Sequence, residues 1–354
     1  MSDTFRAAQA RSAAVEQQMA ENPGSLRMLT GDRPTGALHI GHYFASVKNR
    51  VKLQRSGAEI WQLIADYQVI TDREIAGDIA GSVTNLLIDN IAAGLDPERA
   101  TIFTHSAVPA LNQLMLPFLS LVSVAELQRN PTVKEEARTA GITSLGGLLL
   151  TYPVHQAADI LFCKANVVPV GRDQLPHIEQ TRVIARRFNE RYGVVFPEPD
   201  ALLSPATLIL GTDGTKMSKS KGNVVELRMS ADETAKKVKG AKTDSDRLIT
   251  WDPDNRPEVA NLLLLISLCE GVAPEQVAEE IGDGGGGALK ARLVDALNTE
   301  LAPLRARRAE LASDPAYLAG VLARGNERAN ELAEQTLAEV RSAMGMDYRT
   351  LPSN

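Results

Sequence analysis

The stretch Gly36-Ala37-Leu38-His39-Ile40-Gly41-His42 places two imidazoles three residues apart, near the start of the chain. The glycine between them would let a flat ring lie close to the backbone. A short apolar run, 26–30, precedes this stretch, and an amphipathic segment, 40–55, follows it. This order predicts a strand, a loop and a helix, with His39 at the helix start, where backbone N–H groups favour phosphate.

The alternation of strand and helix continues downstream of this stretch. Further strands are expected at 59–65, 101–103 and 167–170, with helical patterns between them. Such alternation predicts an α/β fold with a Rossmann-like, doubly wound parallel sheet. Ligands of these sheets bind beyond the carboxyl ends of the strands, which is where the loop 31–36 and His39 fall.

The second part of the chain has a different pattern, helix upon helix. Apolar residues recur at helical spacing over 259–268, 288–304 and 326–344, which predicts a C-terminal α-helical domain. The glycine run 282–287 is expected to be a flexible surface connection.

We therefore expect three parts. They are an N-terminal extension (1–24), an α/β domain that carries the site (25–228), and a helical domain (229–354) whose end can pack back on the α/β domain.

The composition is that of an ordinary globular protein. The chain has 354 residues, of which 44% are hydrophobic and 23% charged, and its formal net charge of -6 decides little about partners. No apolar run approaches the roughly 20 residues of a membrane span. The start of the chain also lacks the pattern of a secretion signal, so we expect a cytoplasmic enzyme with no membrane partner. Cys163 and Cys269 belong to no paired ligand motif, and we expect no metal held by protein ligands.

A second short motif, Lys216-Met217-Ser218-Lys219-Ser220, forms a small loop with two positive charges. Two imidazoles and two lysines are groups that can stabilise negative charge on phosphate oxygens. Taken singly, the histidines could instead be a helix cap and the lysines a solvated loop.

Together and in this order, the two motifs resemble the paired ATP signatures of class I aminoacyl-tRNA synthetases. The resemblance covers most of the chain and is closest to the bacterial tryptophanyl-tRNA synthetases. Its supporting segments are Thr30-Gly-Asp-Arg-Pro-Thr-Gly36, Ala65-Asp-Tyr-Gln-Val-Ile-Thr71, Tyr152-Pro-Val-His-Gln-Ala-Ala-Asp-Ile-Leu161 and Val168-Pro-Val-Gly-Arg-Asp-Gln174. The last favours tryptophan, because tyrosyl enzymes usually carry a Gly-Ser-Asp-Gln-like version of it.

The resemblance implies residues for binding and activating ATP, with ATP and Mg²⁺ as cofactors. The implied catalytic residues are His39, His42, Lys216 and Lys219. The implied ATP contacts are Arg33, Thr35, Gly41, Gly171, Asp173, Met217, Ser218 and Ser220.

An amino-acid pocket is predicted on one helix. Tyr152, Gln156 and Asp159 stand at i, i+4 and i+7, so one helical face presents a phenol, an amide and a carboxylate. By resemblance, Asp159 accepts a hydrogen bond from the indole N–H of L-tryptophan, Tyr152 and Gln174 hold its ammonium group, and Gln68 lies in the same pocket. An acceptor-only carboxylate suits a donor-only indole nitrogen.

Three pocket residues depart from the common bacterial pattern. Gln156 stands where methionine is frequent, Gln68 where histidine is frequent, and Arg33 where glutamine is frequent. Gln156 also fits the Tyr-x-x-x-Gln-x-x-Asp pattern of tyrosyl-tRNA synthetases, which remain the alternative. The departures resemble the second, auxiliary type of bacterial tryptophanyl enzyme, and we expect an altered response to tryptophan analogues that compete for the pocket.

The family also implies partners. By resemblance, the helical domain reads the anticodon of tRNA(Trp), and the α/β domain forms a homodimer. Basic clusters lie in this helical domain at 236–242 and 305–308, and a solvated helix face is the default interpretation of each. Two rival functions are a regulatory protein that has lost aminoacylation and a small-molecule adenylyltransferase. The presence of His39, His42, Lys216 and Lys219 disfavours the first. The segment Lys216–Ser220 together with a helical domain disfavours the second.

Overall fold

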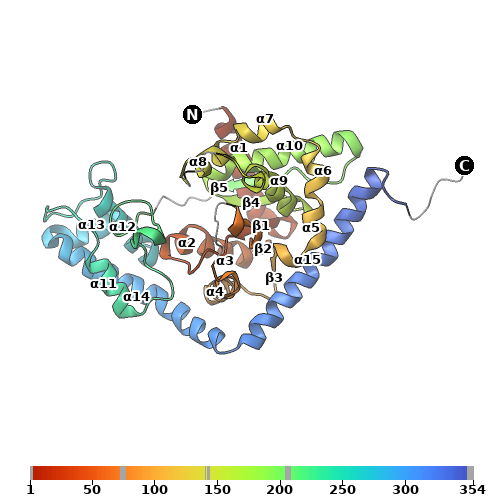
Figure 1. Ribbon diagram of the computed structural model, residues 1–354. Helices are drawn as coiled ribbons and strands as arrows, with labels where there is room; N and C mark the ends of the chain where they lie inside the picture. The colour runs from red at the N-terminus through yellow and green to blue at the C-terminus, as the bar shows by residue number, and fades with distance from the viewer. Residues whose placement is uncertain (1–2, 72–76, 140, 142–143, 204–208, 349–354) are drawn as a thin grey trace, which may run out of the picture.

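The computed structural model describes residues 3–71, 77–139, 141, 144–203 and 209–348 (Figure 1). Its centre is one parallel sheet with the strand order β3-β2-β1-β4-β5. The strands are β1 Arg27–Asp32, β2 Glu59–Ile64, β3 Ala100–Thr104, β4 Val167–Val170 and β5 Asp200–Leu203. The predicted doubly wound sheet is confirmed. The strand order reverses at β1, so a crevice opens beyond the carboxyl ends of β1 and β4.

Alternate residues of the strands enter two separate cores. In β2, Ile60 and Ile64 belong to one apolar cluster, and Trp61 and Leu63 belong to the other. The first cluster includes residues of α3 (Lys48–Arg55) and α4 (Ile79–Ala92), and the second includes residues of α9 (Gly147–Phe162) and α10 (Leu175–Tyr192). Helices on both faces therefore bury Ile60, Trp61, Leu63 and Ile64 of β2, each worth about 1.5–3 kcal/mol.

The predicted helix over 40–55 is present in three consecutive parts. α2 (Ile40–His42) passes into a π-helical turn, Tyr43–Val47, and then into α3. His39 is the N-cap residue of α2. The wider turn is of the kind often found at functional sites.

Four short helices connect β3 to α9. They are α5 Pro109–Gln113, α6 Met115–Leu119, α7 Val124–Arg129 and α8 Pro131–Thr139. α5 starts at a proline, where a missing N–H costs nothing, and Ser123 and Glu126 form a capping box at the start of α7.

The C-terminal part is helical, as predicted. Its helices are α11 Ala231–Lys239, α12 Pro257–Glu270, α13 Pro274–Ile281, α14 Gly285–Ala312 and α15 Pro315–Ala343. Within the described ranges, no single helix is long and apolar enough to cross a membrane. The pair formed by α12 and the stretch Pro274–Ala312 has the length and composition of a membrane span, but its two parts are bent by 109° where they join. Val259, Leu262, Leu263, Leu265 and Ile266 of α12 are buried in the core.

The prediction of a flexible glycine run at 282–287 is wrong. Gly282 starts a short 3₁₀ turn, and Gly285 begins α14. The backbone N–H of Ile249 donates to the carbonyl of Gly282 at 2.8 Å, and that of Gly285 donates to the carbonyl of Arg247 at 2.9 Å. Both glycines have positive φ, 56° and 70°, so the run supplies conformations that other residues rarely adopt, held by specific hydrogen bonds.

The last helix crosses back over the sheet edge. Figure 1 shows α15 running past β3 and α5, and contacts between these elements are extensive. The side-chain oxygen of Asn326 accepts the backbone N–H of Thr104 at 3.0 Å. A β-carbon on Gly325 would lie 1.8 Å from the carbonyl oxygen of Ile102. Glycine is therefore required where α15 touches the backbone of β3.

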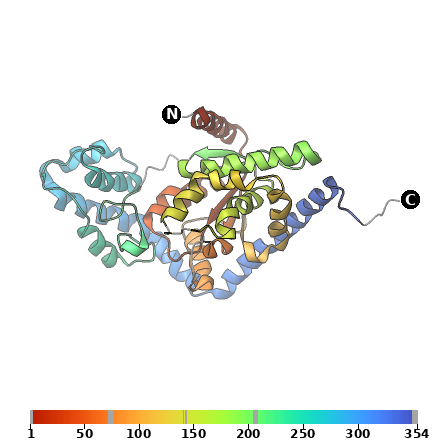
Figure 2. The ribbon, with the colours of Figure 1, turned by 45° about the horizontal axis from the view of Figure 1, so that its top comes forward.

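The N-terminal extension contains a long helix. α1 (Asp3–Glu21) packs on β5, at the opposite edge of the sheet from α15 (Figure 2). Arg11 pairs with Asp200 at 3.1 Å, and the guanidinium of Arg172 lies 4.3 Å from the centre of the Phe5 ring.

Candidate active site

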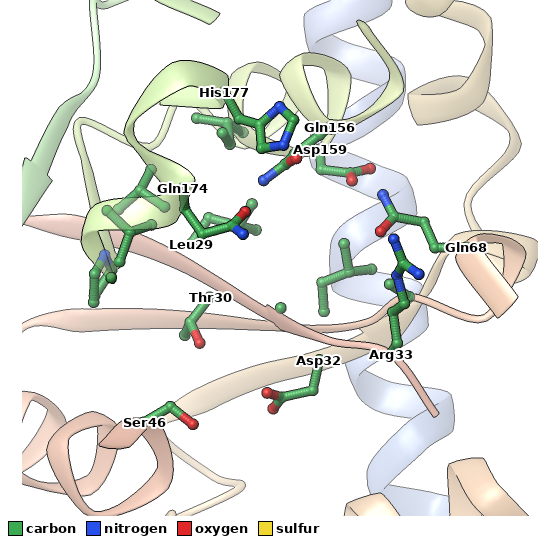
Figure 3. A pocket seen from close by; sticks show the side chains of 18 of the residues that line it. Leu29, Thr30, Asp32, Arg33, Ser46, Gln68, Gln156, Asp159, Gln174 and His177 are labelled. Atoms are coloured by element: carbon green, nitrogen blue, oxygen red, sulfur yellow. The ribbon is translucent and has the colours of Figure 1, made fainter. Parts of the chain in front are cut away.

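A cavity of about 350 Å³ opens at the carboxyl ends of β1 and β4, where the strand order reverses. Figure 3 shows polar side chains entering it from several elements. All five residues predicted to bind tryptophan line it, namely Gln68, Tyr152, Gln156, Asp159 and Gln174. Arg33 and Gly171, two of the predicted ATP contacts, line it as well.

The helix α9 supplies one wall, as its spacing predicted. Tyr152, Gln156 and Asp159 all reach the cavity from this helix. The Tyr152 hydroxyl lies 3.1 Å from Nε2 of His177, which is a residue of α10. Burial lowers the pKa of His177 to about 4, so its ring is neutral at pH 7.

Asp159 lies buried beside a histidine that the sequence did not assign to the site. Its Oδ1 is 2.8 Å from Nε2 of His105, which follows β3. Only the fold could place these residues together, since they are 54 positions apart.

A second polar arrangement includes three residues that line the cavity, Thr30, Asp32 and Arg50. The guanidinium of Arg50 is 2.9 Å from Oδ2 of Asp32, and its Nε donates to the Thr30 hydroxyl at 2.9 Å. The amide of Gln62 donates to the same Asp32 oxygen at 2.9 Å. Thr30, Asp32 and Gln62 are polar residues close to buried apolar residues of their strands, and this was the sequence signal that could have identified them.

The two signature histidines are stacked on each other. Their ring centres are 3.7 Å apart, and Nδ1 of His42 accepts the backbone N–H of His39 at 3.3 Å. Burial, with smaller effects of His42 and Lys219, lowers the pKa of His39 to about 3. Burial and Lys219 also lower the pKa of His42, although Asp32 acts in the opposite direction. Both rings are neutral donors at pH 7.

The lysine loop, residues 216–220, contacts the histidine loop, the segment just before His39, through one of the two lysines, Lys219. Nζ of Lys219 donates to the carbonyl of Thr35 at 3.1 Å. Met217 lies over Gly41, where an added β-carbon would be 2.9 Å from its sulfur. The structure therefore brings Thr35, Gly41, Met217 and Lys219 to the histidine pair.

The other predicted residues of the loop lie farther out. The Lys216 side chain is exposed. The backbone N–H of Ser218 donates to the side-chain oxygen of Asn223 at 2.8 Å, and Ser220 belongs to the short 3₁₀ turn Lys219–Lys221. Asn223 is buried and also contacts Asp213 and Lys216, so it organises the loop. This residue was missed because an asparagine after a glycine looks like any other loop residue.

The remaining predicted ATP contacts stand at the rim. Asp173 is exposed and accepts the amide of Gln174 at 3.1 Å. A β-carbon on Gly171 would be 2.7 Å from the carboxylate of Asp173, which packs against this glycine. Arg33 pairs with Glu136 of α8 at 3.2 Å.

One group of described side chains has metal-ligand atoms within 4.8 Å of one another, the buried set His105, His155 and Asp159. Their atoms form hydrogen bonds instead, between His105 and Asp159 and between His155 Nε2 and Asn112 Oδ1 at 2.8 Å. A larger hollow of about 870 Å³ lies between α3 and the helices α12 and α14, and none of the predicted site residues lines it.

Comparisons with known proteins show the family of the chain. The family model for class I tRNA synthetases (W and Y) matches residues 21–302. The tryptophan--tRNA ligase of Treponema pallidum is 43% identical, over 92% of this chain and 98% of its own length. That of Streptococcus pneumoniae is also 43% identical, over 91% and 98%.

A solved structure is similar throughout. The tryptophanyl-tRNA synthetase of Campylobacter jejuni, complexed with ADP and tryptophan, has a TM-score of 0.77 and 28% identity, and the match covers 90% of this chain and 100% of that one. The chain therefore belongs to the class I tRNA synthetases (W and Y), and among them to the tryptophan--tRNA ligases, which makes it an ATP-dependent aminoacyl-tRNA synthetase.

Proposed function

We propose that the protein activates L-tryptophan with ATP, releases pyrophosphate, and transfers the tryptophanyl group to tRNA(Trp). One observation carries this proposal. The five residues predicted for the amino acid line one cavity beside β1, and the stacked His39–His42 pair starts the helix that follows the same strand. A cavity of about 350 Å³ is at the lower end of the range for ligand pockets, ~300–1,000 Å³, as suits one amino acid.

The proposed selectivity for tryptophan depends on Asp159. Its carboxylate is buried and accepts hydrogen bonds only. The indole N–H can donate to it, whereas a phenyl ring would leave it without a partner from the substrate. Sites of this kind reject the substrate that lacks the polar group by large factors.

The proposed activation step joins the tryptophan carboxylate to the α-phosphate of ATP. The carboxylate oxygen attacks phosphorus, and the bond to the leaving pyrophosphate breaks. His39 and His42 donate to phosphate oxygens as neutral rings, and Lys219 stabilises the negative charge that develops on the leaving group. Lys216, exposed at present, would reach the phosphates when the loop closes between Gly214 and Gly222, which have φ of 81° and 64°.

Magnesium fits this site as an ion held by the nucleotide. The nearby carboxylates Asp32 and Glu136 are already paired with Arg50 and Arg33. Phosphate oxygens and water would then be the ligands, as is common for Mg²⁺. The ion would neutralise part of the phosphate charge.

The parts of the chain have separate proposed roles. Residues 25–228 carry ATP and tryptophan, and residues 229–354 bind the anticodon of tRNA(Trp). Lys236 and Lys239 of α11 are exposed and available to RNA, whereas Arg305 and Arg308 are held by Thr234 and Asp89 within the protein. We also propose a cytoplasmic homodimer, as the family implies.

Charging of tRNA tests this proposal. The purified chain is incubated with ATP, Mg²⁺, a tRNA(Trp) transcript and radiolabelled tryptophan or tyrosine, and acid-precipitable label is counted. Label from tryptophan alone is expected, and Asp159→Ala should reduce it strongly. Adenylate formation without charging would support the adenylyltransferase alternative instead, and neither activity would support the regulatory one.

A further inference from the structure

We propose that His105 is a positioning residue that sets how Asp159 recognises the indole N–H of tryptophan. The inference rests on the proposed function and concerns a residue that never touches the substrate. His105 Nε2 donates to Asp159 Oδ1 at 2.8 Å. Both side chains are removed from solvent, with 0% and 1% exposure.

The ring of His105 is held in one orientation by its neighbours. Tyr67 stacks on it at 6.1 Å between centres with an interplanar angle of 15°, and His155 lies at 4.5 Å with 39°. His155 is itself fixed by its bond to Asn112. The packing of the His105 ring, and not its hydrogen bond with the carboxylate, therefore sets the direction in which the Nε2–H group points toward Asp159.

The second ring nitrogen of His105, Nδ1, faces Asp66. Its Nδ1 lies 3.9 Å from Oδ1 of Asp66, which is too long for a hydrogen bond, and it has no hydrogen-bond partner among the residues described. Asp66 is held by the backbone N–H groups of Tyr67 and Ser106 at 3.0 and 3.2 Å. His105 thus lies between the segment that carries Asp66 and Gln68 and the helix α9, which carries Asp159.

The consequence concerns the second oxygen of Asp159. Within the described part of the chain, no side chain or backbone group donates to Oδ2, and Figure 3 shows the carboxylate at the same end of the cavity as Gln68. His105 anchors one oxygen and leaves the other for a donor in the cavity. Without this anchor the carboxylate would rotate about its soft terminal torsion, and its bond to the indole would weaken.

A substrate without the N–H separates this role from a general structural one. β-(3-Benzothienyl)-L-alanine carries sulfur in place of the indole N–H and cannot donate to Asp159. The experiment measures kcat/KM and KM in amino-acid-dependent ATP–pyrophosphate exchange for tryptophan and for this analogue. The variants are His105→Phe, which fills the space without a donor, and His105→Gln, which retains one. Thr101→Val is the matched control, since it removes a buried polar atom of β3, the strand before His105, and this atom has no hydrogen-bond partner among the described residues.

For His105→Phe we expect kcat/KM for tryptophan to fall roughly 10-fold or more, mainly through KM, because a hydrogen bond to a charged group is lost. The kcat/KM for the analogue should change by less than about threefold. The ratio of kcat/KM for tryptophan to kcat/KM for the analogue therefore falls. His105→Gln should restore the discrimination, and Thr101→Val should leave it intact. His105→Leu gives the same test if phenylalanine is not accommodated.

Equal losses for both substrates, or no change for either, would overturn the role of His105 alone. Absence of tryptophan-dependent exchange by the unaltered chain would overturn the proposed function and this inference with it.

Discussion

Nζ of Lys219 donates a hydrogen bond to the carbonyl oxygen of Thr35 at 3.1 Å, although the two residues are 184 positions apart in sequence. This contact joins the lysine loop to the histidine loop. Lys219→Ala should lower the rate of ATP–pyrophosphate exchange ~100-fold or more, because the positive charge proposed to stabilise the leaving group is lost. Lys221→Ala is the matched control, since Lys221 binds the Thr215 hydroxyl outside the site. Similar rates for the two variants would contradict the role of Lys219.

The contact of Gly325 with β3 predicts a strong effect on stability. An alanine there would place its β-carbon 1.8 Å from the Ile102 carbonyl oxygen, so α15 or β3 must shift. Gly325→Ala should lower Tm by roughly 5 °C or more, measured by circular dichroism. Gly320→Ala on the same helix meets only the flexible end of Arg324, at 3.5 Å. It should leave Tm unchanged or raise it slightly. Equal decreases of Tm in the two variants would show that the close contact of α15 with β3 does not contribute to stability.

Asp89 predicts a pH dependence of stability. It is buried in α4, pairs with Arg308 of α14, and accepts the backbone N–H of Leu38 at 3.3 Å. Burial raises its pKa from 3.8 to about 6, despite opposing effects of Arg308 and Leu38. The folded state therefore binds this proton more tightly than the unfolded state. The resulting stability is fully present below about pH 4 and is lost as the pH rises through 6.

The comparison with Asp89→Asn isolates this group. Between pH 4 and pH 7, the free energy of unfolding of the unaltered protein should fall relative to that of the variant, by on the order of 3 kcal/mol. Urea unfolding at several pH values measures it. Parallel pH profiles would exclude a raised pKa at Asp89.

The cavity amides predict resistance to tryptophan analogues. Gln68 and Gln156 both line the cavity, and an indole-containing analogue whose added group leaves either amide unpaired should bind weakly. The double variant Gln68→His/Gln156→Met should be inhibited more strongly than the unaltered protein, with Ki lower by about tenfold. Comparable inhibition of the two proteins would count against a role for these residues in selecting ligands.

The sequence predicted the features that follow from the local spacing of residues. The strands with their intervening helices, the C-terminal helices, and the face of α9 with Tyr152, Gln156 and Asp159 were all visible from spacing. β5 was not predicted, because four residues hold too little periodicity to mark a strand. The glycine run was misread because its order comes from hydrogen bonds to Ile249 and Arg247, outside the run itself.

The site was predicted only for residues inside motifs. The bond between His105 and Asp159 and the pairing of Arg50 with Asp32 join separate elements, so neither has a local signature. Lys216 and Lys219 looked equivalent in sequence, yet only Lys219 reaches the histidine loop in this conformation of the loop. The positions of such side chains depend on packing, which no pattern of spacing contains.

Amino-acid-dependent ATP–pyrophosphate exchange tests the central claim most directly. The purified chain is assayed with tryptophan and with tyrosine separately, and His42→Ala serves as the control for the histidine pair. We predict exchange with tryptophan alone, lost in His42→Ala. Exchange with tyrosine would contradict the assignment of the cavity to tryptophan, and exchange that survives in His42→Ala would contradict the role given to the stacked histidines.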